Sequence, residues 1–527
     1  MGADRNLNWL KALFPAYCRI ENSGWRWKRV AKPLRRPRRH HQIPNAYESL
    51  KGIMEKEQLD ARLAEFGQSH LLRFWDALDK ATQSGLAAQI ESIDLPLMNR
   101  LTAEWIFSEP EAEAFTEIRP VPTIPRVETA GNDASAACAA GEEAMRAGRV
   151  GLLLVAGGQG TRLGFDGPKG AYPIGPLSND SLFAAHANKI HNLQDRYACT
   201  LPWYIMVSDS NKAASEAFFA AHNHFGLQPD QIFFFTQRMV PCVDGEGKFF
   251  LEAKGRIAMN PNGHGGTYLA MQDNGMLADA RNRGVDTLSY FQVDNWAARV
   301  ADPYFIGYHL LGGGQMSSKI HRKREARESV GVHVLCDGEH RTIEYSELDI
   351  YPQLLETDAD GNVVCDAGNP AIHILDVEFI ENICDHFDEF PWHRAHKKIP
   401  HIDEAGNAVQ PDAPNGYKFE TFIFDALRFV NHAPIALEIP GPGEYTPIKQ
   451  FDGDNSVQGA RKTMREYWAN WLEEAGFKVP RDESGAVAID IEINPEFALT
   501  KDEFLAKVGD LAVSGKGNVS IGANGST

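Results

Sequence analysis

The stretch 152–170, LLLVAGGQGTRLGFDGPKG, constrains the fold of this chain more than any other. It begins with four apolar residues, which is typical of a buried parallel strand. Four glycines then follow within eight residues, and bare backbone of this kind comes close to a ligand and turns its N–H groups toward it. Arg162 lies inside the glycine loop, and Lys169 follows it. A strand that ends in such a loop predicts a site for polyphosphate.

Two other phosphate-binding loops are excluded by their spacing. A dinucleotide-binding loop needs Gly-x-Gly-x-x-Gly, and when the count starts at Gly158 the third glycine position holds Leu163. A Walker loop needs Gly-Lys followed by Ser or Thr, and no such triplet lies in this stretch. The alternative to a ligand site is a glycine turn between a strand and a helix, with two solvated cations.

After Lys169 the sequence pattern alternates between helices and strands. Helices are predicted at 181–193 and 211–224, and buried strands at 203–207 and 232–235. This order predicts an α/β fold with a Rossmann-like, mixed but mostly parallel sheet that is covered on both faces. Ligands of such sheets bind beyond the carboxyl ends of the strands. Strands of a smaller antiparallel sheet are predicted at 317–320, 330–334 and 342–345.

The composition of the chain argues against some classes of binding partner. The chain has 527 residues, enough for two to four domains, and its net charge of −18 argues against general nucleic-acid binding. Seven cysteines are scattered without a Cys-x-x-Cys pair, which indicates reduced thiols and a cytoplasmic location. No apolar run is long enough to span a membrane. We therefore expect neither nucleic acid nor a membrane as a partner.

The glycine stretch resembles the signature of a known family. The string Leu-x-x-Gly-Gly-x-Gly-Thr-Arg-Leu-Gly, with Pro-Lys-Gly after it, is similar to that of the eukaryotic-type UDP-sugar pyrophosphorylases, and among them to the UDP-N-acetylhexosamine pyrophosphorylases. The resemblance covers residues 54–475. It implies a GT-A-like nucleotidyltransferase fold with N-terminal helical and small C-terminal domains. The implied reaction turns UTP and a sugar 1-phosphate into UDP-sugar and pyrophosphate, with Mg²⁺ (or Mn²⁺) as cofactor.

The resemblance also suggests how the chain divides. The predicted parts are a basic extension at 1–53, an N-terminal helical region at 54–130, a central catalytic nucleotidyltransferase domain at 131–445, a small C-terminal domain at 446–514 and a tail at 515–527. The run 26–41 holds eight Lys or Arg and could grip nucleic acid or anionic lipid. We favour a disordered, solvated extension because the run contains two prolines. The tail, rich in Gly, Ser and Asn, is also expected to be disordered.

Two motifs extend the predicted nucleotide site beyond the loop. Gln237 directly follows a strand, where its amide can donate to and accept from the edge of uracil, or else satisfy a loop. Asp294 ends an apolar strand and is a natural Mg²⁺ ligand between phosphates, or else the cap of the next turn. The resemblance favours the uracil role for Gln237 and the metal and nucleotide role for Asp294. It assigns further nucleotide contacts to Ala156, Gly157, Gly158, Gly160, Thr161 and Gly263.

The resemblance assigns a second group of residues to catalysis and to the sugar. Arg162 and Lys169 are expected to neutralise the pyrophosphate side, and Lys449 with Lys418 to place the attacking phosphate. Sugar contacts are expected from His264, Glu344, Asn369, Phe422 and Phe424. The two phenylalanines could instead be ordinary core residues of one strand.

Two departures from the family pattern leave the choice of sugar open. His264 stands where the N-acetylhexosamine enzymes have Asn and the glucose-type relatives have His, and Ile372 replaces a family Asn. The remaining match favours N-acetylglucosamine 1-phosphate, whereas these two positions favour glucose or galactose 1-phosphate. The sequence is also compatible with an enzyme of broad specificity and with a non-catalytic UDP-sugar sensor on the same fold.

Overall fold

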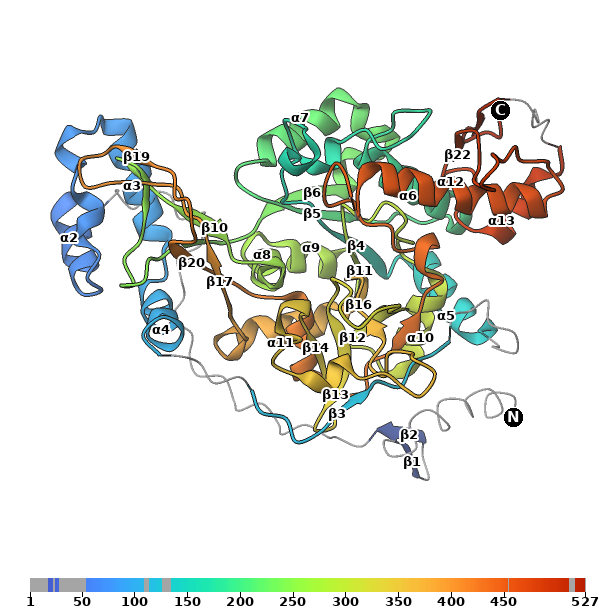
Figure 1. Cartoon of the computed structure of the whole chain (residues 1–527), viewed down its shortest axis with the longest axis horizontal. Coiled ribbons are helices and arrows are strands. Elements are labelled where there is room, and N and C mark those ends of the chain that lie inside the picture. Colours follow the sequence, from blue (N-terminus) through green and yellow to red (C-terminus); the bar gives the residue numbers. More distant parts are fainter. Residues whose placement is uncertain are drawn as a thin grey trace.

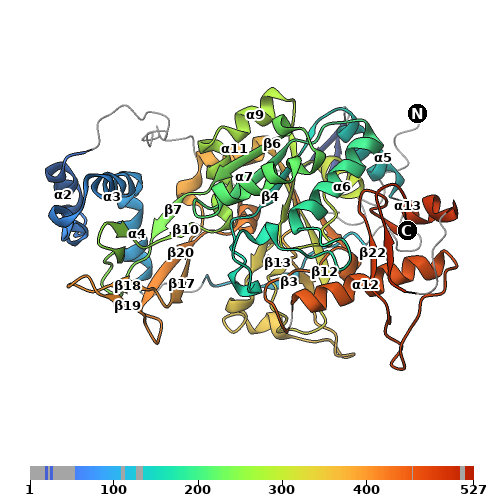
Figure 2. The same cartoon turned by 90° about the horizontal axis from the view of Figure 1, so that it is seen from above.

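The computed structural model describes residues 18–21, 24–27, 54–108, 113–125, 134–453, 455–510 and 517–526. Figure 1 shows three regions along the longest axis, with N-terminal helices at one end, a large sheet in the middle and C-terminal helices at the other end. Figure 2, which is turned by 90°, shows the same order. The glycine loop belongs to the middle region.

An eleven-stranded mixed sheet forms this middle region. Its strands are β3 Ile118–Pro120, β4 Val150–Val155, β5 Trp203–Val207, β6 Ile232–Thr236, β11 Thr287–Gln292, β12 Met316–Arg322, β13 Val332–Cys336, β14 Glu339–Ile343, β15 Ala367–Gly368, β16 His373–Asp376 and β21 Ala436–Glu438. The main path is β14-β13-β15-β12-β16-β11-β4-β5-β6, with β21 on β12 and β3 on β13. Strands β11, β4, β5 and β6 pair in parallel. The predicted α/β fold with a Rossmann-like mixed sheet is therefore confirmed.

The predicted smaller sheet is not separate from the main one. The stretches 317–320, 330–334 and 342–345 fall on or beside β12, β13 and β14, and these strands join the main sheet. They do so because β16 pairs antiparallel with both β11 and β12. That prediction is wrong because alternation of apolar and polar residues indicates a strand but not its partner.

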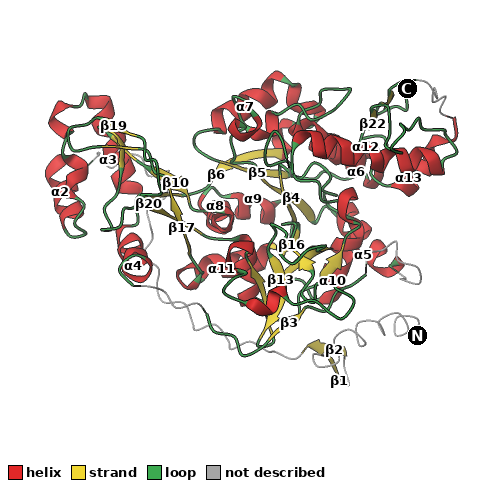
Figure 3. Ribbon diagram, viewed as in Figure 1, coloured by secondary structure: helices red, strands yellow, loops and turns green. Residues whose placement is uncertain are grey.

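Helices cover both faces of the sheet (Figure 3). Alternate residues of β4 point to opposite faces, so that Leu152 and Leu154 lie in one core cluster and Leu153 in another. The first cluster includes side chains of α5 Ser135–Arg146, α6 Leu182–Tyr197, α7 Lys212–Ala221, α10 Pro303–Gly312 and α12 Val457–Glu474. The second includes side chains of α8 Thr267–Asp273, α9 Met276–Asn282 and α11 Val377–Asp385. The helices predicted near 181–193 and 211–224 are confirmed as α6 and α7.

The N-terminal helices pack away from the main sheet. They are α2 Lys56–Ala64, α3 Lys80–Ser92 and α4 Leu95–Trp105, and Asp79 and Asp94 cap the last two. Their core includes Leu63 and Leu101 together with Phe249 and Phe419 from later in the chain. Short paired strands supply this partner surface: β7 Met239–Pro241, β8 Leu251–Ala253, β9 Arg256–Ile257, β10 Met259–Pro261, β17 His393–Lys397, β18 His401–Ile402, β19 Ala408–Val409 and β20 Gly416–Glu420.

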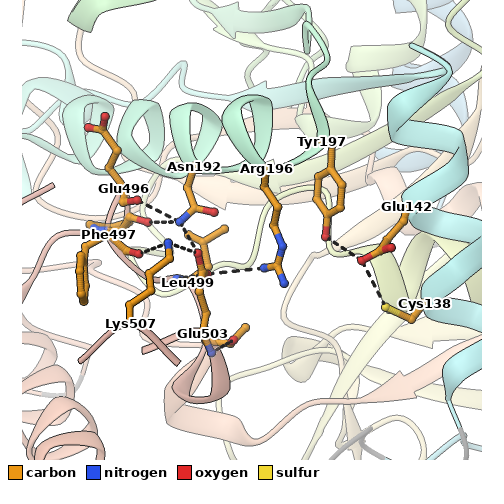
Figure 4. Close-up of polar contacts among 12 residues, drawn as sticks. Cys138, Glu142, Asn192, Arg196, Tyr197, Glu496, Phe497, Leu499, Glu503 and Lys507 are labelled. Carbon is orange, nitrogen blue, oxygen red and sulfur yellow. Dashed lines mark hydrogen bonds and ion pairs between the residues drawn. The ribbon is translucent and has the colours of Figure 1, made fainter. Parts of the chain in front are cut away.

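Polar contacts hold the C-terminal region on α6 (Figure 4). The region continues from α12 through β22 Ile491–Ile493 and α13 Lys501–Lys507 to β23 Val519–Ile521. The amide of Asn192 on α6 donates to the Glu496 carbonyl oxygen at 3.0 Å and to the Glu503 carboxylate at 2.9 Å. Arg196, one turn later on α6, lies 3.6 Å from the same carboxylate.

Two predicted disordered segments contain regular structure. In the tail, β23 pairs in parallel with β22, so the prediction is wrong for Val519–Ile521, while residues 515, 516 and 527 lie outside the described part. In the extension, β1 Cys18–Glu21 and β2 Gly24–Trp27 form an antiparallel hairpin, which the prediction also missed. The rest of 1–53, including most of the basic run, lies outside the described residues. None of the helices that the structure describes has the length and apolar content needed to cross a bilayer.

Helices α5 and α10 touch backbone to backbone through two glycines. A Cβ built at Gly307 of α10 would lie 1.6 Å from the carbonyl oxygen of Ala137, and one built at Gly141 of α5 would lie 1.9 Å from that of Pro303. Only glycine permits this approach. Because α10 follows the carboxyl end of β11, the contact fixes the chain that leaves that end of the sheet.

We expect Gly307→Ala to lower the free energy of unfolding by about 1–3 kcal/mol, because the added methyl group overlaps the Ala137 carbonyl and forces the helices apart. Gly85→Ala is the matched control, since Gly85 lies inside α3 with nothing within 4 Å of an added Cβ. This control should instead gain about 0.5–1 kcal/mol from helix propensity. Urea unfolding midpoints measure both, and equal midpoints would contradict the close packing.

Candidate functional site

The glycine loop folds back on itself at the carboxyl end of β4. The Gly160 N–H donates to the Gly167 carbonyl at 2.9 Å, and the Lys169 N–H donates to the Gly158 carbonyl at 3.0 Å. A Cβ on Gly158 would stand 3.8 Å from the Lys169 side chain. The fold of the loop therefore brings its bare backbone and the Lys169 side chain together.

Asn211 anchors the loop from the start of α7. Its amide nitrogen donates to the carbonyl oxygens of Ala156 at 3.1 Å and Gly158 at 3.2 Å, and its oxygen accepts from the Ser208 N–H. Asn211 is fully buried. The sequence pattern identifies Asn211 only as the start of a helix. Its position after a strand is the one feature of the sequence that could have pointed to a role at this edge of the sheet.

Lys169 forms an ion pair with Asp294, which follows β11. The Lys169 Nζ lies 2.7 Å from the Asp294 Oδ2, and the two side chains are only 11% and 17% exposed. Strands β4 and β11 pair in parallel with Val155 opposite Gln292, so the chain leaves both strands at one edge of the sheet. The predicted phosphate cation and the predicted metal ligand are therefore neighbours.

The segment 444–451 lies against both the glycine loop and the end of β11. Ile448 N–H donates to the Asp294 carbonyl at 2.9 Å, and Phe451 N–H donates to the Arg162 carbonyl at 3.1 Å. Lys449 lies between these two contacts. The structure thus gathers Arg162, Asp294 and Lys449 in one region, although they are far apart in sequence.

A buried network fixes this segment from behind. The Asn295 amide donates to the Glu444 carbonyl at 2.9 Å, and its oxygen accepts from Thr446 N–H at 3.0 Å. The Glu444 carboxylate pairs with Lys319, which is fully buried, and with Arg299 at 3.3 Å. The sequence pattern predicts no role for these residues. They act through contacts between segments that are far apart in the sequence, so no local pattern shows their role.

A cavity of about 220 Å³ opens beside Asp294 and Lys449. Six residues with predicted roles line it, namely His264, Asp294, Glu344, Asn369, Phe424 and Lys449. Ten further lining residues have no role predicted from the sequence: Gln292, Asn295, Ser329, Val330, Gly331, Tyr345, Pro370, Ala371, Tyr445 and Pro447. The cavity joins the predicted phosphate side to the predicted sugar side.

His264 is a neutral side chain with a fixed tautomer. Its Nδ1 accepts from the Ile423 N–H at 2.9 Å, so the proton of the neutral ring is on Nε2. Burial lowers the pKa of His264 to about 4, which keeps the ring uncharged. Its ring packs against Phe422 and Phe424 at centroid distances of 5.4 and 5.7 Å. His264 therefore offers a donor, but no positive charge, to this side of the cavity.

Glu344 and Asn369 also line the cavity. Burial, and then repulsion from Glu347, raise the pKa of Glu344 to about 7. The Asn369 oxygen accepts from Ala371 N–H at 2.9 Å, and its amide donates to the Thr342 hydroxyl at 3.3 Å. Both side chains are hydrogen-bonding groups suited to hydroxyls.

Gln237 lies where the loop meets the start of α8. Its amide nitrogen is 3.3 Å from the Gly263 carbonyl, and its oxygen would lie 3.2 Å from a Cβ on Gly157. Gly263 has φ +83°, and a Cβ there would come within 2.3 Å of the Thr421 carbonyl. Three predicted nucleotide residues therefore adjoin, and at Gly263 only glycine fits without strain.

Lys418, Phe422 and Ile372 are among the residues singled out by the sequence that do not line the cavity, as are the residues of the glycine loop. Lys418 lies on β20 opposite Ala395, and Phe422 stacks with His393 at 4.3 Å as well as with His264. Ile372 is 1% exposed within the core of the sheet. The expected phosphate role of Lys418 and sugar role of Phe422 stay predictions, whereas Ile372 contributes to packing.

The acids that line the cavity suit a phosphate-bound cation better than a metal held by protein alone. Among the described residues, no group of three or more His, Cys, Asp or Glu is arranged to hold a metal. Two acids line the cavity, Asp294 and Glu344. Magnesium is commonly held by one or two carboxylates together with substrate phosphates, so Asp294 beside the glycine loop fits that cation.

Comparison with known proteins gives a consistent result. The model of the UTP–glucose-1-phosphate uridylyltransferase family matches residues 117–457. The UDP-N-acetylglucosamine pyrophosphorylase of Saccharomyces cerevisiae is 36% identical over 431 residues, which cover 78% of this chain and 90% of the yeast protein. The human UDP-N-acetylhexosamine pyrophosphorylase-like protein 1 is 35% identical over 442 residues, covering 80% and 87%.

A solved structure is similar throughout its length. The crystal structure of uridine diphosphate N-acetylglucosamine pyrophosphorylase from Trypanosoma brucei, in complex with an inhibitor, superposes with a TM-score of 0.74 at 26% identity. The match covers 87% of this chain and 96% of the trypanosomal chain. With the family match over most of the chain, these similarities and the gathered site establish that the protein belongs to the UTP–glucose-1-phosphate uridylyltransferase family.

Proposed function

We propose that the protein transfers the uridylyl group of UTP to N-acetylglucosamine 1-phosphate, giving UDP-N-acetylglucosamine and pyrophosphate. One observation carries the proposal: Asp294 and Lys449, expected at the phosphates, line the same cavity as Glu344 and Asn369, expected at the sugar. Its relatives from yeast and Trypanosoma brucei are named as UDP-N-acetylglucosamine pyrophosphorylases.

The location we propose is cytoplasmic, supported by six described cysteines that are all free thiols.

The chemistry requires that two anions meet. An oxygen of the sugar phosphate attacks the α-phosphorus of UTP, a new P–O bond forms, and the bond to the β-phosphate oxygen breaks to release pyrophosphate. A sugar phosphate is already ionised at neutral pH, so no general base is needed. Arg162 and Lys169 neutralise the pyrophosphate side, while Lys449 places the attacking phosphate. Positioning and charge then supply the rate.

A divalent cation completes the balance of charge. Asp294 would hold Mg²⁺ (or Mn²⁺), and the bound cation would offset negative charge on the phosphates of UTP. The loop supplies the remaining positive potential through Lys169 and its backbone N–H groups. Asn295 and Ile448 keep Asp294 in register with the segment that carries Lys449.

The sugar choice depends on one position. His264 donates through Nε2, whereas the amide of Asn can both donate and accept. This difference favours glucose or galactose 1-phosphate as the second candidate. The other departure, Ile372, lies in the core and gives that candidate no support.

The deciding experiment measures pyrophosphate release with N-acetylglucosamine, glucose and galactose 1-phosphates at saturating UTP and Mg²⁺. We expect kcat/KM to be highest for the N-acetylated substrate by about tenfold or more, because polar groups left unpaired by a poorer substrate are costly. His264→Asn is the companion variant and should widen this preference. A higher kcat/KM for glucose or galactose 1-phosphate would overturn the sugar assignment.

Lys449→Ala should reduce kcat on the order of 10²–10³-fold, since it removes one electrostatic contact to the reacting phosphates. Lys449 lines the cavity, whereas the control Lys462→Ala changes an exposed lysine on α12 and should keep wild-type turnover. Steady-state kinetics at saturating UTP compare the two variants. Unchanged turnover in Lys449→Ala would remove this residue from the mechanism.

Glu344 should make sugar binding depend on pH. Its pKa is raised to about 7, so the carboxylate that accepts from hydroxyls predominates above that pH, and KM for the sugar 1-phosphate should fall as the pH rises through it. Glu344→Gln cannot ionise and should lose this step while keeping any step that belongs to the substrate phosphate. Identical KM profiles in the two proteins would contradict the role of Glu344.

A further inference from the structure

We propose that the ion pair between Lys169 and Asp294 is a latch that makes metal binding and UTP binding depend on each other. The inference rests on the proposed function, in which Asp294 holds the cation and Lys169 contacts the phosphates of UTP. It adds that, without nucleotide, the two side chains are paired with each other, so that neither is free for its ligand. The two ligands should therefore bind cooperatively through the protein.

The geometry supports such a latch. The Lys169 Nζ lies 2.7 Å from the Asp294 Oδ2, and both side chains are mostly buried, so the pair is poorly screened by solvent. A divalent cation bound to Asp294 would lie close to the Lys169 ammonium, and like charges at that separation repel. Lys169 is therefore a competitor for the carboxylate that the metal needs.

The nucleotide can release the latch. The Lys169 N–H donates to the Gly158 carbonyl, and the Lys169 Cδ would lie 3.8 Å from a Cβ on Gly158. The flexible end of this side chain can therefore turn its ammonium from Asp294 toward phosphates bound on the glycine loop. Once phosphates neutralise Lys169, the Asp294 carboxylate becomes available to the metal. By reciprocity the metal also strengthens UTP binding, and coupling of this kind is typically about 5–150-fold.

The test is a Mn²⁺ titration without nucleotide, followed by the electron paramagnetic resonance signal of the free ion. Lys169→Met should bind Mn²⁺ about tenfold more tightly than the wild type, because the competing cation is gone. The same variant should bind UTP more weakly in EDTA, as measured by equilibrium dialysis. One substitution thus moves two affinities in opposite directions, which loss of folding would not do.

Matched variants identify the carboxylate responsible. Lys501→Met also frees an acid, because Lys501 lies 2.8 Å from Glu474, but that pair is exposed and remote, and no gain in Mn²⁺ affinity is expected. The double variant Lys169→Met/Asp294→Asn should lose the gain. If Lys169→Met does not fold, Lys169→Gln removes the same charge and takes its place.

The outcomes separate the latch from the proposed function. Equal Mn²⁺ affinity in Lys169→Met and the wild type, or a gain that survives in the double variant, would overturn the latch. If Mn²⁺ strengthens UTP binding as much in Asp294→Asn as in the wild type, the metal role of Asp294 fails instead, and the latch fails with it. Opposite shifts confined to Lys169→Met and absent from Lys501→Met support the proposal.

Discussion

Parallel pairing of β4 with β11 is the constraint on which the site depends. It brings the glycine loop and Asp294 to one edge of the sheet, where Lys169 can pair with Asp294 at 2.7 Å. Reversal of either strand would place the loop and the carboxylate at opposite edges. The α5–α10 contact reinforces this arrangement, since it holds the chain that leaves β11. The pairing of these strands thus determines which charged side chains lie close together in the site.

The positions of residues at the ends of strands could be predicted from the sequence, because a strand and the loop that follows it are consecutive in the chain and form one local pattern. The glycine loop, Gln237 and Asp294 are of this kind. Residues such as Asn295, Glu444 and Lys319 could not, because they act through contacts between segments more than a hundred residues apart. The same reason explains the errors: pairing of β16 with β12, and of β23 with β22, is a long-range choice that local alternation does not encode.

The buried network behind the cavity is better explained by how it positions the segment 444–451 than by a gain in the free energy of unfolding. A buried ion pair such as Lys319 with Glu444 gains little net stability over apolar side chains of similar size, since both charges lose their hydration. It does, however, fix the start of the segment that carries Lys449 in one register against β12. A misplacement of about 1 Å can cost roughly 10²-fold in rate where charges must align, which gives a physical reason to retain such a pair.

In the proposed function, sugar recognition depends on the neutral state of His264. A charged imidazole at this point would attract the sugar phosphate and compete with Lys449 for it, whereas a neutral ring donates one directed hydrogen bond. Burial against Phe422 and Phe424 favours the neutral ring, and the Ile423 N–H fixes which nitrogen carries the proton. In that proposal, the two aromatic residues affect specificity by keeping His264 neutral. Replacement of His264 by Asn keeps a donor and adds an acceptor, so it changes which substituents of the sugar can be satisfied without changing the charge of the cavity.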